Sequence, residues 1–199
     1  PDPKIDGGYF LLLAGLPGAT LAQGAAATAS PAASASGAAA SPVDASGPFG
    51  RFCLLPTDAN RRYLLIGTGT GVTPYRAMLP QLAAQIAGRG IEVVLLFGAR
   101  TPEELLYGDE FRTCANKHPN FRFVPCFSRE LPAEGSPHAH ADVRKGYVQD
   151  QLAEFAPQAE TDIAYLCGNP NMVDVCFETL KSHHLPVPHI RREKYVSSK

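Results

Sequence analysis

The sequence has little net charge, no paired cysteines and no long apolar run. Its formal net charge is −1 over 199 residues, so no global basic field points to nucleic acid or to an acidic membrane surface. The five cysteines are scattered, without a C-x-x-C pair, which fits a reducing compartment and argues against a disulfide framework or a zinc or iron–sulfur motif. No apolar run approaches 18 residues and no basic-plus-apolar leader is present. We therefore expect a cytoplasmic protein with no membrane span and no metal site.

The first 55 residues differ in composition from the remainder. Residues of about 24–46 are mostly Ala, Ser, Gly and Pro. Alanine-rich sequence can be helical, but the interspersed Ser, Gly and Pro favour a mobile insert without chemistry of its own. We therefore place a domain boundary near residue 55, with a second domain over 56–199.

From residue 61 onward, patterns of strand and helix alternate. The predicted strands are apolar runs at residues 63–66, 91–97, 121–127 and 163–167, followed by an extended tail at 186–195. Nearly unbroken apolar runs are typical of strands buried on both faces of a parallel sheet. The sequence thus predicts an α/β domain with an open, doubly wound, five-stranded parallel sheet, in which ligands bind at the carboxyl ends of the strands.

Three glycines follow the first predicted strand directly. Gly67, Gly69 and Gly71 lack a Cβ, so an anion can approach their main-chain N–H groups. Pro74 then suits the first turn of a helix, whose N-terminus also favours anions. The spacing is neither G-x-G-x-x-G nor a P-loop. Tight packing between helix and strand requires the same glycines, so the loop alone is compatible with either role.

Polar or small residues also follow the other predicted strands. They are Gly98-Ala99-Arg100, Ser128-Arg129-Glu130 and Cys167-Gly168-Asn169-Pro170. Because the carboxyl ends of parallel strands meet at one edge of a sheet, we expect a single nucleotide cleft there.

Six segments in order resemble the ferredoxin–NADP reductase family. They are Gly47-Pro48-Phe49-Gly50-Arg51-Phe52, Gly67-Thr68-Gly69-Thr70-Gly71-Val72-Thr73-Pro74, Gly98-Ala99-Arg100, Ser128-Arg129-Glu130, Cys167-Gly168-Asn169-Pro170-Asn171-Met172 and Glu193-Lys194-Tyr195. The resemblance implies that residues 1–55 contain the last part of a flavin-binding antiparallel β-barrel and that residues 56–199 form the NADP-binding domain. It also implies hydride transfer between NADP(H) and FAD, with single-electron exchange to ferredoxin or flavodoxin.

The resemblance also implies roles for individual residues. The loop at 67–74 would hold the pyrophosphate. The phosphate on the adenosine ribose would be bound by Ser128, Arg129 and Lys145, and the adenine would stack on Tyr147. The cofactor-binding set is Gly67, Thr68, Gly69, Thr70, Gly71, Val72, Thr73, Pro74, Arg100, Ser128, Arg129, Lys145, Tyr147, Gln149, Gly168, Asn169 and Met172. Cys167, Glu193 and Tyr195 would form the catalytic set, with Cys167 beside the nicotinamide and the other two bordering the flavin.

The residue types favour NADP over NAD. A dianionic phosphate binds guanidinium and ammonium donors with help from a hydroxyl, which Arg129, Lys145 and Ser128 supply. Users of NAD are expected to place an acidic residue on the ribose hydroxyls instead. Glu130 is acidic, but Arg129 directly precedes it and favours the phosphate. We therefore expect selectivity for the phosphorylated nucleotide.

Several of these residues would also fit a purely structural role. Cys167 could be a small buried apolar residue, Lys145 a solvated charge, and Glu193 and Tyr195 the end of an edge strand.

The family's Arg-x-Tyr-Ser flavin motif is absent from the sequence. Two alternative functions therefore remain: an NAD(P)H reductase component of an oxygenase system, or a non-catalytic NADP-binding fragment without a flavin site.

Overall fold

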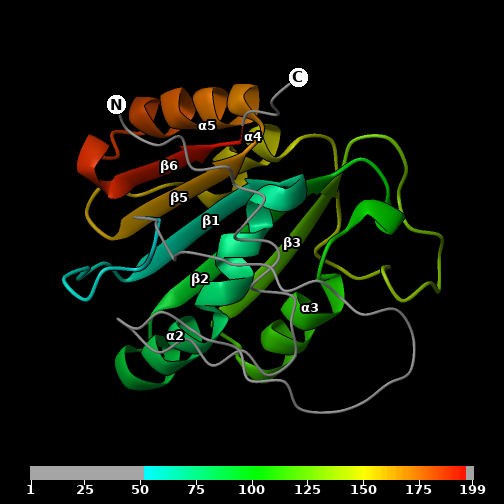
Figure 1. Cartoon of the computed structure of the whole chain (residues 1–199), viewed down its shortest axis with the longest axis horizontal. Helices are drawn as coiled ribbons and strands as arrows, with labels where there is room; N and C mark the ends of the chain where they lie inside the picture. The colour runs from blue at the N-terminus through cyan, green and yellow to red at the C-terminus, as the bar shows by residue number, and fades with distance from the viewer. Residues whose placement is uncertain (1–51, 196–199) are drawn as a thin grey trace, which may run out of the picture. The chain divides into compact units, whose positions relative to one another are not determined.

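A computed structural model describes residues 52–195 of the chain (Figure 1). The strands are β1 (Arg62–Thr68), β2 (Glu92–Ala99), β3 (Phe121–Phe127), β4 (Arg144–Lys145), β5 (Asp162–Gly168) and β6 (Ile190–Lys194). The α-helices are α2 (Thr73–Arg89), α3 (Gly108–Lys117), α4 (Val148–Gln151) and α5 (Pro170–Ser182). Four short 3-10 helices are η1 (Gly69–Val72), η2 (Pro102–Glu104), η3 (Leu152–Phe155) and η4 (Val187–His189).

The strands form one parallel sheet in the order β4-β3-β2-β1-β5-β6. From β1 the chain proceeds outward through β2, β3 and β4, and then crosses back to place β5 on the other side of β1. In open α/β sheets this reversal of direction separates the loops at the strand ends and creates a crevice. Here the reversal lies beside β1, where Gly67 pairs with Cys167 of β5.

Helices cover both faces of the sheet. Helices α2 and α3 pack on the face that carries Tyr63 and Leu65 of β1, and α4 and α5 pack on the face that carries Leu64 and Ile66 (Figure 1). All four of these β1 side chains are 0% exposed. Burial on both faces explains why the central strands are continuously apolar rather than alternating.

The segment that precedes β1 is held by a partly buried ionic contact. Arg191 of β6 donates to both carboxylate oxygens of Asp58, at 2.8 and 2.5 Å, and the Tyr165 hydroxyl donates to the same carboxylate at 3.0 Å. The ring of Phe52 lies edge-on to Tyr165, with 5.5 Å between centroids. These contacts attach residues 52–58 to strands β5 and β6.

The predicted α/β class with an open parallel sheet is confirmed, but the sheet has six strands rather than five. The additional strand, β4, is only two residues long, too short for hydrophobic periodicity to indicate it. Residues 148–155 form two short consecutive helices, α4 and η3. Within residues 52–195, no helix combines the length and the apolar character needed to span a bilayer. The predicted barrel segment and the Ala/Ser-rich insert lie almost wholly outside the described residues.

Candidate functional site

The carboxyl ends of β1, β2, β3 and β5 open into a groove of about 830 Å³. Its walls come from five stretches of sequence and from Tyr195 after β6. The lining residues are Thr68, Gly69, Thr70, Gly98, Ala99, Arg100, Glu104, Cys126, Ser128, Gly146, Tyr147, Val148, Gln149, Gly168, Asn169, Pro170, Asn171, Met172 and Tyr195. This volume lies within the range of about 300–1,000 Å³ that is typical of small-molecule sites.

The three glycines after β1 have different environments. A Cβ on Gly71 would lie 2.3 Å from the carbonyl oxygen of Cys167, and one on Gly67 would lie 2.9 Å from the Tyr75 ring. These two glycines therefore permit close packing of η1 and α2 against the strands. Gly69 has a φ of +54° with no atom within 4 Å of its Cβ position, and it lines the groove. Of the three, only Gly69 leaves its main chain open to a ligand.

Asn169 joins the two sides of the groove at the reversal point. Its backbone N–H donates to Thr68 Oγ1 at 3.0 Å. Its side-chain oxygen accepts from the N–H groups of Asn171 and Met172, at 2.9 and 3.3 Å, and thereby caps α5. The 13-residue helix α5 therefore begins at the groove, with the positive end of its dipole where an anion would be stabilised.

Cys167, Glu193 and Tyr195 meet where β5 and β6 end. Cys167 pairs with Glu193 in the β5–β6 register, and the Tyr195 N–H donates to Gly168 at 2.9 Å. The Cys167 thiol is 0% exposed, and its burial, reinforced by the nearby Glu193 charge, raises its pKa to about 12 despite an opposing hydrogen bond with Tyr195. Partial desolvation raises the pKa of the exposed Glu193 carboxyl. With its raised pKa, the Cys167 thiol is protonated at neutral pH and is not a thiolate nucleophile.

The ends of β2 and β3 are joined by main-chain hydrogen bonds. Ser128 donates to Ala99 at 3.1 Å and Arg129 donates to Arg100 at 3.0 Å through their N–H groups. Arg100 forms a two-point contact with Glu104, at 2.6 and 2.8 Å, on the groove wall. Tyr147 lines the groove with 60% of its surface exposed, which leaves a flat aromatic face available for stacking.

The structure divides the predicted site residues into two groups. Those that line the groove are Thr68, Gly69, Thr70, Arg100, Ser128, Tyr147, Gln149, Gly168, Asn169, Met172 and Tyr195. Those that do not are Gly67, Gly71, Val72, Thr73, Pro74, Arg129, Lys145, Cys167 and Glu193. Arg129, Lys145 and Glu193 are exposed, whereas the other residues of the second group are packed inside the fold.

Several lining residues were not in the predicted cofactor-binding or catalytic sets, although Gly98, Ala99 and Pro170 belong to the strand-end segments expected at the cleft. They are Gly98, Ala99, Glu104, Cys126, Gly146, Val148, Pro170 and Asn171. Gly98 had a usable signal, since it follows a predicted strand, and its Cβ would lie 2.8 Å from the Thr68 side chain. Cys126 had none, because a buried strand cysteine has the same sequence pattern whether or not a groove lies above it.

Comparison with known proteins identifies a family and several relatives. Residues 65–177 match the family described as the oxidoreductase NAD-binding domain. The reductase subunit of an aromatic O-demethylase from Amycolatopsis is 34% identical over 157 residues, which cover 77% of this chain and 44% of the relative. The root-type chloroplastic ferredoxin–NADP reductase of Nicotiana tabacum is 32% identical over 148 residues, which cover 70% of this chain and 38% of the relative.

Solved structures show the same fold. The Amycolatopsis reductase GcoB has a TM-score of 0.64 at 31% identity, over 76% of this chain and 43% of that chain. A variant of ferredoxin–NADP⁺ reductase from Plasmodium falciparum has a TM-score of 0.55 at 25% identity, over 71% of this chain and 56% of that chain. The chain spans less than half the length of the two curated relatives described above.

Proposed function

The chain belongs to the oxidoreductase NAD-binding domain family, and we propose that it supplies the NADP-binding part of a ferredoxin–NADP reductase. In this function a hydride passes between NADP(H) and bound FAD, and single electrons pass between the flavin and ferredoxin or flavodoxin. The main support is the groove at the reversal point of the sheet, where residues from four strand ends face one cavity. The named relatives include ferredoxin–NADP reductases, which supports the same function.

The donors around the groove fit a dinucleotide. The open main chain at Gly69 and the N-terminus of α5 suit the pyrophosphate. We propose that Ser128, Arg129 and Lys145 bind the phosphate on the adenosine ribose, with Tyr147 stacked on the adenine. Arg129 and Lys145 are exposed beside the groove rather than in its lining, and long side chains of this kind can reach a phosphate from the rim.

We propose that the Cys167, Glu193 and Tyr195 cluster adjoins the nicotinamide and the flavin. Nicotinamide and flavin supply the hydride chemistry when bound. Because the Cys167 thiol is protonated, the group at the end of β5 is small and neutral. A thiolate at the same place would repel a neighbouring anion. Tyr195 lines the groove, and its ring can cover a flat cofactor surface.

A reductase component of an oxygenase system is the second candidate. It is favoured by the relatives named as the reductase subunit of an aromatic O-demethylase and the reductase component of a propane 2-monooxygenase. The two candidates share the nucleotide chemistry and differ in the electron acceptor. We propose a cytoplasmic location for either, on the basis of the cysteine pattern.

Absorption spectroscopy of the purified protein, with and without added FAD, tests the proposed function. We expect a flavin band that bleaches on addition of NADPH under anaerobic conditions and recovers when ferredoxin or flavodoxin is added. A bleached band that recovers only with an oxygenase favours the second candidate. Colourless protein that binds NADP but retains no flavin overturns the proposed reductase activity and supports the non-catalytic alternative.

A further inference from the structure

Ser128, Gly146 and Tyr147 line the end of the groove where we place the phosphate on the adenosine ribose, which we call the phosphate end. The position of this end depends on a short strand. Strand β4 pairs with β3 at only two positions, Cys126 with Arg144 and Phe127 with Lys145. It follows a loop over residues 128–143 that contains no helix or strand. Gly146 and Tyr147 come directly after β4 and line the groove. A two-residue ladder provides few hydrogen bonds, so other contacts must fix where these residues lie relative to Ser128.

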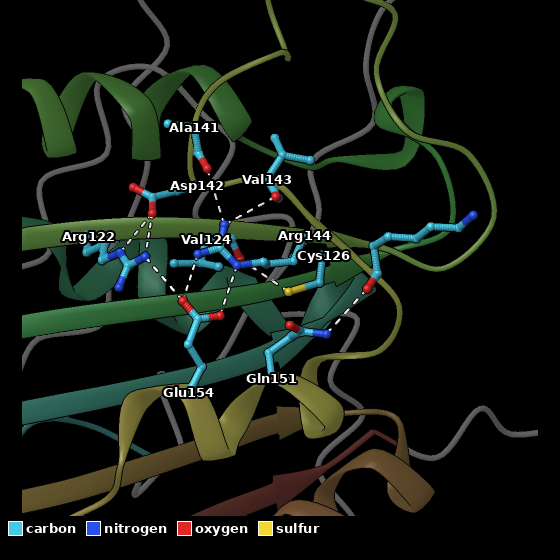
Figure 2. A network of polar contacts seen from close by, with 10 residues as sticks. Arg122, Val124, Cys126, Ala141, Asp142, Val143, Arg144, Gln151 and Glu154 are labelled. Carbon is cyan, nitrogen blue, oxygen red and sulfur yellow. Dashed lines mark hydrogen bonds and ion pairs between the residues drawn. The ribbon is translucent and has the colours of Figure 1, made fainter.

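Arg144 supplies such contacts. Its guanidinium donates to both carboxylate oxygens of Glu154, at 2.9 and 2.7 Å, and to the carbonyl groups of Ala141 and Val143, at 3.2 and 3.3 Å. Figure 2 shows Glu154 extending from η3 toward Arg144, with Arg122 on the other side of the carboxylate. One side chain thus connects β4 and the end of the loop to the η3 turn.

The contact belongs to a network of alternating charge. Arg122 of β3 donates to Asp142 at 2.9 and 2.6 Å and lies 3.6 Å from Glu154 (Figure 2). The four charged side chains of this network, Arg122, Asp142, Arg144 and Glu154, are between 24% and 41% exposed. An isolated surface ion pair contributes little, but a planar two-point contact within a network fixes geometry.

The segment after β4 is tied to the neighbouring helix. Gln151 of α4 donates through its side-chain nitrogen to the Lys145 carbonyl at 3.3 Å. Gly146 donates through its N–H to the Phe127 carbonyl at 2.9 Å. Hydrogen bonds from Arg144 lower the pKa of the Glu154 carboxyl, so the carboxyl is ionised at neutral pH. The contact between Glu154 and Arg144 is therefore an ion pair at neutral pH.

We propose that Glu154 is a positioning residue for the phosphate end of the groove. Through Arg144 it fixes β4, and thereby the placement of Lys145 and Tyr147 opposite Ser128. It thus sets the preference for nucleotides that carry a phosphate on the adenosine ribose, without touching the nucleotide. This inference rests on the proposed NADP function.

The sign of a mutational effect separates positioning from a simple charge effect. Glu154 is negative, so removing its charge would strengthen the binding of an anion if only its electrostatic field mattered. Loss of positioning has the opposite effect, because the phosphate ligands lose their fixed placement. The change Glu154→Gln distinguishes the two, since it keeps the size of the side chain and removes its charge.

The test is calorimetric titration of the protein with NADP⁺ and NAD⁺, which differ only by the phosphate. For Glu154→Gln we expect the dissociation constant for NADP⁺ to rise about five- to tenfold and that for NAD⁺ to change less than about twofold. Glu178→Gln is the matched control, because it breaks an exposed Lys181 contact of 2.9 Å on α5 away from the groove. It should change neither constant.

Three results would overturn the proposal: an unchanged or stronger affinity for NADP⁺ in Glu154→Gln, an equal weakening with both nucleotides, or a wild-type protein that does not prefer NADP⁺. The third would also overturn the proposed nucleotide, whereas the first two leave it standing. Should Glu154→Gln fail to fold, Asp142→Asn carries the same test, because it loosens the same network at Arg122. A selective loss for NADP⁺ with either variant supports the proposal.

Discussion

The backbone N–H of Asn169 lies 3.0 Å from Thr68 Oγ1 and donates to it, so the loops after β5 and β1 are hydrogen-bonded to each other at the reversal point of the sheet. The two residues are 101 positions apart in the chain. The same asparagine caps α5 through its side chain. A single residue thus fixes the spacing of the groove walls and the start of the helix that faces it.

Asn169→Ala should destabilise the protein by about 1 kcal/mol, because α5 loses its N-cap acceptor. Urea unfolding of the variant and the wild type measures the difference. Asn171→Ala is the control, since Asn171 contributes only its backbone N–H to the cap, and it should stay within about 0.5 kcal/mol of the wild type. Equal losses in both variants would contradict the role of the cap.

Gly71→Ala should destabilise the protein by about 2 kcal/mol or more and impair nucleotide binding, because the new Cβ would lie 2.3 Å from a main-chain oxygen that cannot move aside. Gly88→Ala is the control: Gly88 lies near the end of α2, with no atom within 4 Å of its Cβ position. That change should stabilise the protein by about 0.5–1 kcal/mol. Thermal unfolding measures both, and a tolerated Gly71→Ala would contradict the packing.

Arg129→Ala should weaken NADPH use by about 1.5–3 kcal/mol and leave NADH use nearly unchanged, because the proposed role of the guanidinium is to contact only the ribose phosphate. Steady-state kinetics with each nucleotide measures the two effects. Lys117→Ala on α3, outside the groove, should alter neither. An equal loss with NADPH and NADH would contradict the assignment of Arg129.

The Asp58–Arg191 contact should make stability depend on pH in the acid range. Burial opposes ionisation of Asp58, but hydrogen bonds from Arg191 and Tyr165 outweigh it and lower the pKa of the carboxyl. A carboxyl with a lowered pKa contributes stability above its unfolded pKa of about 3.9 and loses that contribution as the pH falls through the folded value.

Asp58→Asn should therefore destabilise the protein at pH 7 by about 1.5–3 kcal/mol, because Arg191 loses its charged partner. The gap between variant and wild type should start to narrow as the pH falls below about 3.9, because the unfolded chain then binds a proton at Asp58 that the folded carboxyl binds only at lower pH. Urea unfolding at several pH values measures this gap. A gap that is constant between about pH 7 and pH 3 would contradict the lowered pKa.

The cysteines should differ in reactivity toward a thiol reagent. Burial raises the pKa of Cys126, Cys167 and Cys176 to about 12 each, whereas Cys53 is exposed. At pH 8 the three buried thiols should react more slowly than Cys53, because few of them are ionised and the reagent cannot reach them in the folded protein. The absorbance of the chromophore that the reagent releases measures how many thiols have reacted over time. Prompt reaction of Cys167 in the folded protein would contradict its burial.

Local sequence was sufficient for the central sheet and for the general place of the groove. The runs at residues 91–97 and 121–127 are apolar without alternation, which occurs when both faces are covered, and they form β2 and β3. The polar residues after these runs had to converge, because parallel strands end at the same edge of a sheet. Lys145 and Arg129, assigned by resemblance, lie beside the groove rather than in its lining, and their role stays a prediction.

The sequence by itself determined the parallel α/β sheet and the edge at which the groove lies, since periodicity and strand-end residues are local properties of the chain. Only the tertiary structure decided that Gly71 packs against Cys167 while Gly69 stays open, that β4 joins the sheet, and that Arg144 meets Glu154. Asp58 and Arg191 are 133 positions apart, and no local pattern pairs them. Contacts of this kind depend on how the strands are ordered, because that order alone brings distant side chains within hydrogen-bonding distance.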